Sequence, residues 1–219
     1  MKRPLGITRL LVVYAHPAKD ESLSGAILDA FVEGAKGAGL EVRVRDLYAL
    51  NFNPVVSKQD WFDGFTGKVP PDCEEEQRHV TWADALCFIA PAWNWSMPAM
   101  LKGYLDRAFV IPGFSFSSDP TGSTYLGGLL THKKALILQT LGGNLQTGFR
   151  FGNVADYAQG LVSAMHYCGV RNTHVQQFWN MYKQSREAPG MAALLARCRA
   201  LGATFDEQDD ELVQGLSTC

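Results

Sequence analysis

Three short segments of the chain carry the groups best suited to hold a ligand. One contains a histidine and two serines, the second places two tryptophans and an asparagine between two prolines, and the third contains two adjacent glycines. Serine and histidine side chains donate hydrogen bonds to anions, indole rings stack on flat molecules, and glycine lets a ligand approach the backbone closely. The segments are residues 16–24, 91–98 and 140–144.

The first segment is expected to bind an anion, because it leads from an apolar strand into the N-terminus of a helix, where backbone N–H groups and the helix dipole favour negative charge. His16, Ser22 and Ser24 add possible side-chain donors. The segment lacks the G-x-x-x-x-G-K-[ST] pattern, so a phosphate monoester or diphosphate held without Mg²⁺ fits better than a nucleoside triphosphate. The alternative is that Ser22 only caps the helix and His16 is a surface residue.

The second segment predicts a stiff aromatic turn. Trp93, Asn94 and Trp95 lie between Pro91 and Pro98, and proline restricts the backbone on either side. Such a turn can present backbone N–H groups to the edge of a flat ligand while its rings flank the ligand. The alternative is a hydrophobic plug between a sheet and a helix.

The third segment contains Gly142 and Gly143, which can expose backbone amide donors to a ligand. An ordinary turn also explains two glycines, so this signal is weak by itself. Together the three segments suit a flat cofactor that bears a phosphate, and flavin is the main candidate.

The elements that must position these segments alternate between strand and helix five times. The strands are mostly apolar along their length, rather than alternating between apolar and polar residues. This pattern is typical of a parallel sheet covered by helices on both faces. Five units favour an α/β, flavodoxin-like three-layer sandwich with strand order 2-1-3-4-5. The expected strands are 7–15, 41–45, 85–90, 133–139 and 173–178, and the expected helices are 22–38, 74–81, 98–109, 153–167 and 191–205.

In this strand order the three segments meet. Ligands bind at the carboxyl ends of the strands near the point where the order reverses, which lies between the first and third strands with the fourth beside them. The three segments follow those three strands. We therefore expect one site within a single domain, residues 1–205, followed by an acidic and frayed tail, residues 206–219.

Composition excludes several other classes. The 219 residues have a formal net charge of -2, which provides no field for nucleic acid or an anionic membrane. The five cysteines are an odd number without CxxC spacing, so neither a disulfide framework nor a metal site is expected. No apolar run reaches the roughly 18 residues of a membrane span. A cytoplasmic location, without membrane insertion or nucleic-acid binding, is the default expectation.

The residues also resemble a known family, the flavodoxin-like NAD(P)H:quinone oxidoreductases of the DT-diaphorase type, together with related bacterial quinone reductases and potassium-efflux ancillary proteins. The matching stretches lie in the family's order between Leu11 and about Gly143. They are LVVYAHPAKDESLSGAI, DLYALNFNPVVS, PAWNWSMPAMLKGYLDRAF with GFSF behind it, and QTLGG. The rest of the chain matches mainly in layout.

The resemblance implies FAD as cofactor, with FMN the close alternative, and NAD(P)H as co-substrate. It implies that the flavin phosphate is held by His16, Ser22, Leu23 and Ser24. The isoalloxazine would be lined by Pro91, Ala92, Trp93, Asn94 and Trp95, and its pyrimidine edge would meet Thr140, Leu141, Gly142 and Gly143. The family also implies a homodimer whose sites lie at the subunit interface.

The expected activity is hydride transfer from NAD(P)H to flavin N5, followed by two-electron reduction of a quinone or similar aromatic acceptor in a ping-pong cycle. Backbone amides of Gly142 and Gly143 would stabilise the negative charge of the reduced flavin. Arg150 is a further candidate for this catalytic role, and a solvent-facing arginine is the alternative. The chain departs from the animal enzymes after the paired glycines, where it is shorter and lacks their histidine, and between Ser57 and Glu76.

Two other functions stay open at this point. A flavin-containing ancillary subunit of a membrane transporter would have only incidental oxidoreductase activity. A one-electron flavodoxin carrier is less favoured, because the net charge of -2 provides little steering toward a partner. The aromatic residues Trp61, Phe62, Phe65, Phe114 and Phe116 could form either a subunit interface or a substrate wall.

Overall fold

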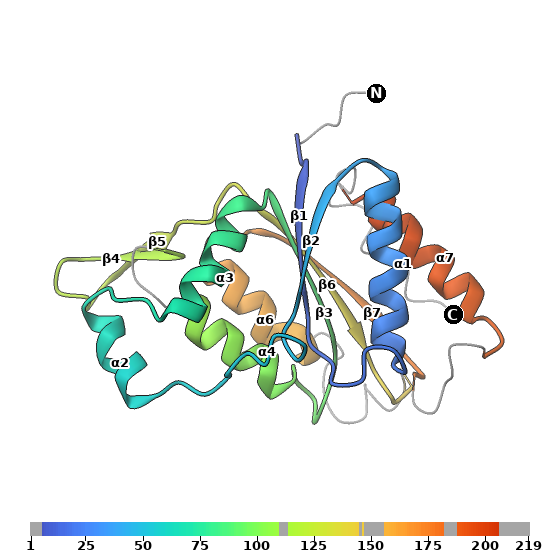
Figure 1. Ribbon diagram of the computed structural model, residues 1–219, viewed down its shortest axis with the longest axis horizontal. Helices are drawn as coiled ribbons and strands as arrows, with labels where there is room; N and C mark the ends of the chain where they lie inside the picture. The colour runs from blue at the N-terminus through green and yellow to red at the C-terminus, as the bar shows by residue number, and fades with distance from the viewer. Residues whose placement is uncertain (1–5, 110–113, 145, 147–155, 182–187, 206–219) are drawn as a thin grey trace.

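A five-stranded parallel sheet forms the middle layer of the molecule (Figure 1). The structure is a computed structural model that describes residues 6–109, 114–144, 146, 156–181 and 188–205. The strand order β2-β1-β3-β6-β7 confirms the predicted order 2-1-3-4-5, because β6 and β7 are the fourth and fifth strands of this sheet. The strands span Arg9–Tyr14 (β1), Glu41–Asp46 (β2), Ala85–Pro91 (β3), Lys134–Thr140 (β6) and Asn172–Phe178 (β7).

Helices cover both faces of the sheet, as the apolar strands predict. Figure 1 shows α1 and α7 on one face and α3, α4 and α6 on the other. Successive side chains of a strand point to opposite faces, so Leu10 and Val12 pack in the core beneath α1 and α7, whereas Leu11 and Val13 pack in the opposite core. The helices span Leu23–Gly37 (α1), Pro71–Trp82 (α3), Ala99–Tyr104 (α4), Asp156–Tyr167 (α6) and Met191–Ala203 (α7).

Helices α1 and α7 approach each other closely through glycine. A Cβ atom added at Gly34 would lie 1.9 Å from the backbone oxygen of Arg199, and one added at Gly202 would lie 2.1 Å from the backbone oxygen of Phe31. No side chain fits at such distances. The two glycines therefore set how near α7 lies to the helix that begins at the first segment.

Two expected helices differ from the structure. The helix expected at 74–81 begins at Pro71, because proline is well tolerated in the first turn and Asp72 and Glu74 complement the positive end of the helix dipole there. The helix expected at 98–109 comprises α4 and then a π-helical turn, η1 (Leu105–Phe109). The remaining expected bounds agree within a few residues, apart from 153–155, which lie outside the described residues.

The sequence patterns missed helix α2 (Lys58–Phe65) and a two-stranded antiparallel hairpin, β4 (Phe116–Ser118) and β5 (Tyr125–Gly128). A capping box begins α2: Ser57 Oγ accepts from the backbone N–H of Asp60, and the Asp60 carboxylate accepts from the backbone N–H of Ser57, both at 3.0 Å. Arg107 of η1 then holds this segment in place, with Nε 3.1 Å from Asp60 Oδ2 and Nη1 2.5 Å from Asp72 Oδ2.

Within the described ranges, no helix is long and apolar enough to cross a membrane. The same part of the chain contains no group of three or more histidine, cysteine or acidic residues placed to hold a metal ion. The predicted acidic tail, 206–219, lies outside the described residues, so the division at residue 205 stays a prediction.

Candidate active site

The three segments meet at the carboxyl ends of β1, β3 and β6, where sequence analysis places them. The backbone N–H of Ala92, after β3, donates to the backbone oxygen of Thr140 at 2.8 Å. The hydroxyls of Ser24 and Thr140 lie 2.9 Å apart and join the first turn of α1 to the end of β6. The rings of His16 and Trp93 lie 5.7 Å apart. Turns from three strands therefore form one connected surface.

His16 is held as a neutral hydrogen-bond donor. Its Nδ1 accepts from the backbone N–H of Ala18 at 3.1 Å, and burial lowers the pKa of the imidazole. With Nδ1 occupied as an acceptor, the proton of the neutral ring belongs on Nε2. The histidine therefore offers an N–H donor at the entrance to α1.

The two serines of this segment have structural partners. Ser22 is the N-cap of α1: its Oγ accepts from the backbone N–H of Gly25 at 3.0 Å and lies 3.0 Å from the Tyr14 hydroxyl. The expectation that the Ser24 side chain donates to a bound anion is corrected, because this side chain is buried and bonds to Thr140. Its backbone N–H and that of Leu23 are the first two of the helix, which have no acceptor within the helix itself.

The second segment contains a tight turn in an uncommon backbone conformation. Asn94 and Trp95 have φ angles of 47° and 67°, and the turn is closed by hydrogen bonds from Trp93 N to Ser96 O (2.8 Å) and from Ser96 N to Trp93 O (3.1 Å). Asparagine tolerates this left-handed region, whereas a bulky residue there costs about 1–2 kcal/mol. The amides of Asn94 and Trp95 take no part in closing the turn.

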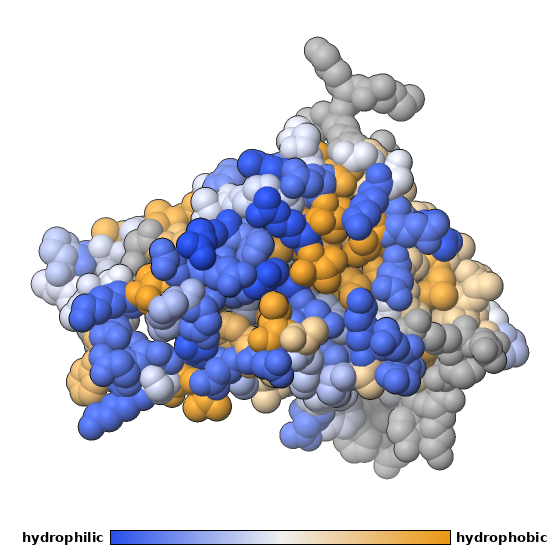
Figure 2. All heavy atoms as spheres, in the orientation of Figure 1, coloured by the Kyte–Doolittle hydropathy of each residue, from blue (hydrophilic) through white to orange (hydrophobic). Residues whose placement is uncertain are grey.

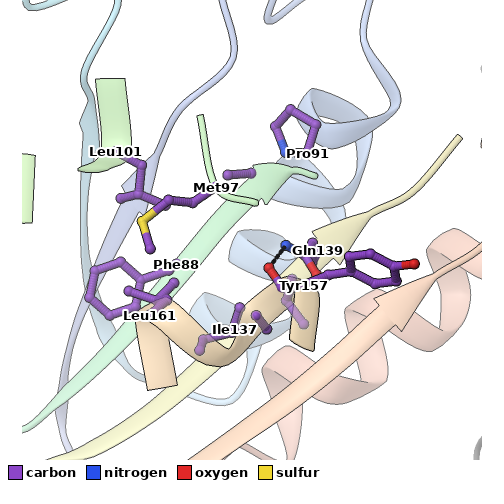
Figure 3. Close-up of a pocket in the computed structure, with 11 residues that line it drawn as sticks. Phe88, Pro91, Met97, Leu101, Ile137, Gln139, Tyr157 and Leu161 are labelled. Atoms are coloured by element: carbon purple, nitrogen blue, oxygen red, sulfur yellow. Dashed lines mark hydrogen bonds between the residues drawn. The ribbon is translucent and has the colours of Figure 1, made fainter. Parts of the chain in front are cut away.

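The alternative of a hydrophobic plug between sheet and helix is correct for Pro91 and Met97 and wrong for the two tryptophans. Pro91 and Met97 line a mostly apolar pocket between the sheet and helices α4 and α6 (Figure 3). Trp93 and Trp95 are 42% and 52% exposed. Their rings therefore form the surface of the site rather than its filling.

The third segment divides into a buried and an exposed half. Leu141 is buried, and its backbone N–H donates to the backbone oxygen of Phe178 at 2.8 Å, so its amide is not available to a ligand. Gly142 and Gly143 are exposed, and the oxygen of Gly143 accepts from the backbone N–H of Asn180 at 2.9 Å. The chain that follows β7 therefore supports the two glycines from one side.

The family model of the flavodoxin-like fold matches residues 8–201 of the chain. The chain belongs to this family. An uncharacterized NAD(P)H oxidoreductase of Haemophilus influenzae is 31% identical over 173 residues, covering 78% of this chain and 84% of that protein. A ribosyldihydronicotinamide dehydrogenase [quinone] of Pongo abelii is 30% identical over 190 residues, covering 74% and 78%. The structure of an NAD(P)H:quinone oxidoreductase from Methanothermobacter marburgensis superposes with a TM-score of 0.79 at 26% identity, covering 93% of this chain and all of that one.

The chain is thus a flavodoxin-like oxidoreductase, which confirms the family and enzyme class expected from its motifs. The alternative of an ancillary subunit of a membrane transporter receives no support from these comparisons.

Two further aromatic residues lie at this candidate site and were not predicted from the sequence. Tyr157, near the start of α6, stacks on Trp95 with ring centroids 5.3 Å apart and planes at 28°, and Trp179 packs edge-on against Tyr157 at 5.8 Å. Trp179 directly follows a predicted strand, so the rule that found the other segments also points to it. Nothing in the local sequence marks Tyr157.

Arg150, the candidate cation for the reduced cofactor, lies outside the described residues. Its role stays a sequence-based prediction.

Proposed function

We propose that this oxidoreductase holds a flavin across the three turns, takes electrons from NAD(P)H and reduces a quinone or a similar planar acceptor. The observation that carries the proposal is the connection of the turns after β1, β3 and β6 by the Ala92–Thr140 and Ser24–Thr140 hydrogen bonds. Donors and aromatic rings remain exposed on the surface that these bonds create. The names of the relatives support NAD(P)H and quinones as the substrate classes.

The donors suit a flavin phosphate at the first segment. The backbone N–H groups of Leu23 and Ser24 begin α1, where an anion is favoured. The hydrogen bond from the Ala18 backbone N–H to His16 Nδ1 orients the imidazole, so that its Nε2–H can donate to the phosphate. Ser22 supports this arrangement as the N-cap that shapes the helix entrance.

The rings and glycines suit the planar part of the cofactor. Pro91 and Ala92 lead into the aromatic turn, whose exposed tryptophans provide flat surfaces, and the turn is closed by the Trp93–Ser96 backbone bonds rather than by the amide of Asn94. The pyrimidine edge would meet the exposed glycines, while Thr140 and Leu141 position them from below.

When bound, the flavin supplies the redox chemistry by accepting a hydride from NAD(P)H and passing two electrons to the acceptor. Gly142 and Gly143 would stabilise the negative charge that gathers at the pyrimidine edge, because fixed backbone donors need no reorganisation during the reaction. Arg150 would add a cation for the same charge. Trp93 and Trp95 would orient the nicotinamide and the acceptor in turn, in one shared pocket, which is consistent with a ping-pong order.

A homodimer and a cytoplasmic location belong to the same proposal. Apolar side chains at the surface support an interface on the segment around α2, where Val55, Trp61 and Phe62 are 66%, 62% and 55% exposed. Figure 2 shows apolar surface near this segment and over β2. Phe116 is buried against Tyr167 of the same chain, so this residue is not part of an exposed interface. Light scattering of the purified protein would measure the oligomeric state.

The proposal is tested by the absorption spectrum of the purified protein. We expect stoichiometric binding of added flavin, bleaching of its absorbance by anaerobic NADPH or NADH, and recovery of the absorbance on addition of a quinone. A protein that binds neither FAD nor FMN would overturn the proposed site.

FAD is proposed ahead of FMN because the sequence resembles the DT-diaphorase type. Separate titrations of the apoprotein with FAD and FMN, followed by chromatography of the flavin released on denaturation, decide between them. We expect the tighter complex with FAD, and equal or tighter binding of FMN would exclude a role for the adenine half.

A further inference from the structure

Trp95 places the bicyclic ring of its indole at the candidate site, on a tight turn with an uncommon backbone conformation. Its side chain is 52% exposed, and its φ of 67° lies in the left-handed region that bulky residues rarely adopt. A half-exposed indole on an isolated two-residue turn is free to change rotamer unless another group fixes it. The turn therefore needs a partner to give the site a constant shape.

Tyr157 is that partner. Its ring stacks on the indole of Trp95 at 5.3 Å with an interplanar angle of 28°, and the residue is only 5% exposed. Trp179 closes the other side of the cluster with an edge-on contact to Tyr157 at 5.8 Å. A buried ring enclosed in this way gives the exposed indole a rigid backing.

Gln139 fixes Tyr157 in turn. The side chain of Gln139 is buried at the end of β6, and its Nε2 donates to the backbone oxygen of Tyr157 at 3.0 Å (Figure 3). Its Oε1 accepts from Gln177 Nε2 at 3.0 Å, so the amide is held at both ends. A buried amide with both groups paired has one orientation. The chain of contacts therefore runs from two strands, through Tyr157, to the exposed face of Trp95.

We infer that Tyr157 and Gln139 are positioning residues that set acceptor specificity, by holding Trp95 as a rigid two-ring wall that favours flat bicyclic acceptors over single-ring ones. This inference rests on the proposed function, because it assigns a substrate preference to the same site. Stacking on an aromatic wall grows with the overlapping ring area, so a naphthalene-sized ring system gains more from the whole indole than a benzene-sized one. A pre-ordered wall adds to the gain, because binding then costs little side-chain ordering.

The test compares a two-ring with a one-ring acceptor in matched variants. With the holoenzyme, we expect Tyr157→Leu to raise the KM for 1,4-naphthoquinone by about three- to tenfold and that for 1,4-benzoquinone by less than about twofold, with little change in kcat. Tyr157→Phe, which keeps the ring, retains the wild-type ratio of the two KM values. Gln139→Leu lowers the preference although both aromatic residues remain.

A binding measurement separates this inference from the proposed function. The dissociation constants of 2-naphthol and phenol, which report on the wall without electron transfer, are measured by calorimetry on the flavin-loaded protein or, if it binds no flavin, on the protein as purified. We expect tighter binding of naphthol in the wild type and loss of that preference in Tyr157→Leu. If quinones are not turned over but the preference for naphthol is retained, the proposed function is overturned and this inference stands.

Trp95→Leu keeps the test decisive where Tyr157→Leu does not fold, because residue 95 is exposed. We expect this variant to lose the preference for bicyclic ligands. We expect the double variant Trp95→Leu, Tyr157→Leu to show the same preference as Trp95→Leu alone, because Tyr157 acts through Trp95. Equal effects on one-ring and two-ring ligands, or a wild type without the preference, would overturn the inference.

Discussion

The two ends of strands β1, β3 and β6 differ in their hydrogen bonding. We call them the amino edge and the carboxyl edge of the sheet. At the amino edge, the Asp84 carboxylate before β3 accepts hydrogen bonds from the backbone N–H groups of Thr8 and Arg9, from the Thr8 hydroxyl and from Arg9 Nη2, at 2.8–3.0 Å. Lys133, buried before β6, donates from Nζ to the backbone oxygen of Ala83. Asp84 and Lys133, which each precede one strand, thus pair with polar groups near the start of the neighbouring strand.

At the carboxyl edge, the Ala92–Thr140 backbone bond and the Ser24–Thr140 hydroxyl pair join the turns and leave other groups of these turns exposed. Ala92 bonds to Thr140, yet Trp93 and Trp95 are about half exposed and Gly142 and Gly143 are exposed. This edge also contains the non-glycine residues Asn94, Trp95 and Asn180 in the left-handed region. Strained and exposed residues tend to gather where a protein binds its ligands.

If the proposed function is correct, stability and cofactor binding are separated between the two ends of the same three strands. We expect changes at the amino edge to alter the free energy of unfolding without altering cofactor affinity, and changes at the carboxyl edge to do the reverse. Four predictions test this separation.

The largest effect is expected for Asp84→Ala. Hydrogen bonds to a charged group contribute roughly 1.5–3 kcal/mol each, and this carboxylate is partly exposed, so we expect the free energy of unfolding to fall by about 2–3 kcal/mol in urea titrations. Asp84→Asn, which keeps one acceptor oxygen, should lose less. The flavin dissociation constant should stay within about twofold of the wild type. A parallel loss of flavin affinity would show that the two edges are coupled.

The same carboxylate predicts a pH dependence of stability. Burial alone would raise the pKa of Asp84, but the hydrogen bonds from Arg9 and Thr8 outweigh it and hold the pKa well below its usual range. Because the folded pKa lies below the unfolded value of about 3.9, this stabilisation is complete above about pH 5 and is lost as the pH falls through the folded value. Urea midpoints of wild type and Asp84→Asn should therefore converge in acid. A constant gap between them would contradict this assignment.

At the carboxyl edge, Gly143→Val should weaken flavin binding by about tenfold or more, because a branched side chain would stand where the cofactor approaches the exposed backbone. Gly37→Val is the matched control, since a Cβ there meets nothing within 4 Å and the residue ends α1 away from the site. Flavin titrations of both variants measure the effect. Equal affinities would remove the glycine pair from the proposed contact surface.

A smaller effect is expected for His16→Gln, which removes the oriented Nε2–H donor. A hydrogen bond to a charged group such as the phosphate contributes roughly 1.5–3 kcal/mol, and the glutamine amide can still donate and recover part of it, so the flavin dissociation constant should rise by roughly two- to tenfold. The exposed His132, at the start of β6 on the amino edge, provides the control variant His132→Gln. If both variants bind flavin like the wild type, the phosphate is held by backbone groups alone.

The fold could be predicted from the sequence because its signals are local. An apolar run such as residues 85–90 predicts a strand buried on both faces, and the observed β3 is buried throughout. Helix α2 was missed because it is only eight residues long and contains Gly64, so its helical period is too short to stand out in the sequence. It is held by Arg107, which lies 47 residues from Asp60 in the chain.

The pairing of the strands and the meeting of the three turns at their carboxyl ends follow from hydrophobic period and strand order, so they can be predicted from the residues alone. The structure was needed to show that the Ser24 hydroxyl bonds to Thr140, that the Leu141 amide donates to Phe178, and that Tyr157 stacks on Trp95. A side chain's hydrogen-bond and stacking partners come from distant parts of the chain, here more than one hundred residues apart for Ser24 and Thr140, and no local pattern encodes them.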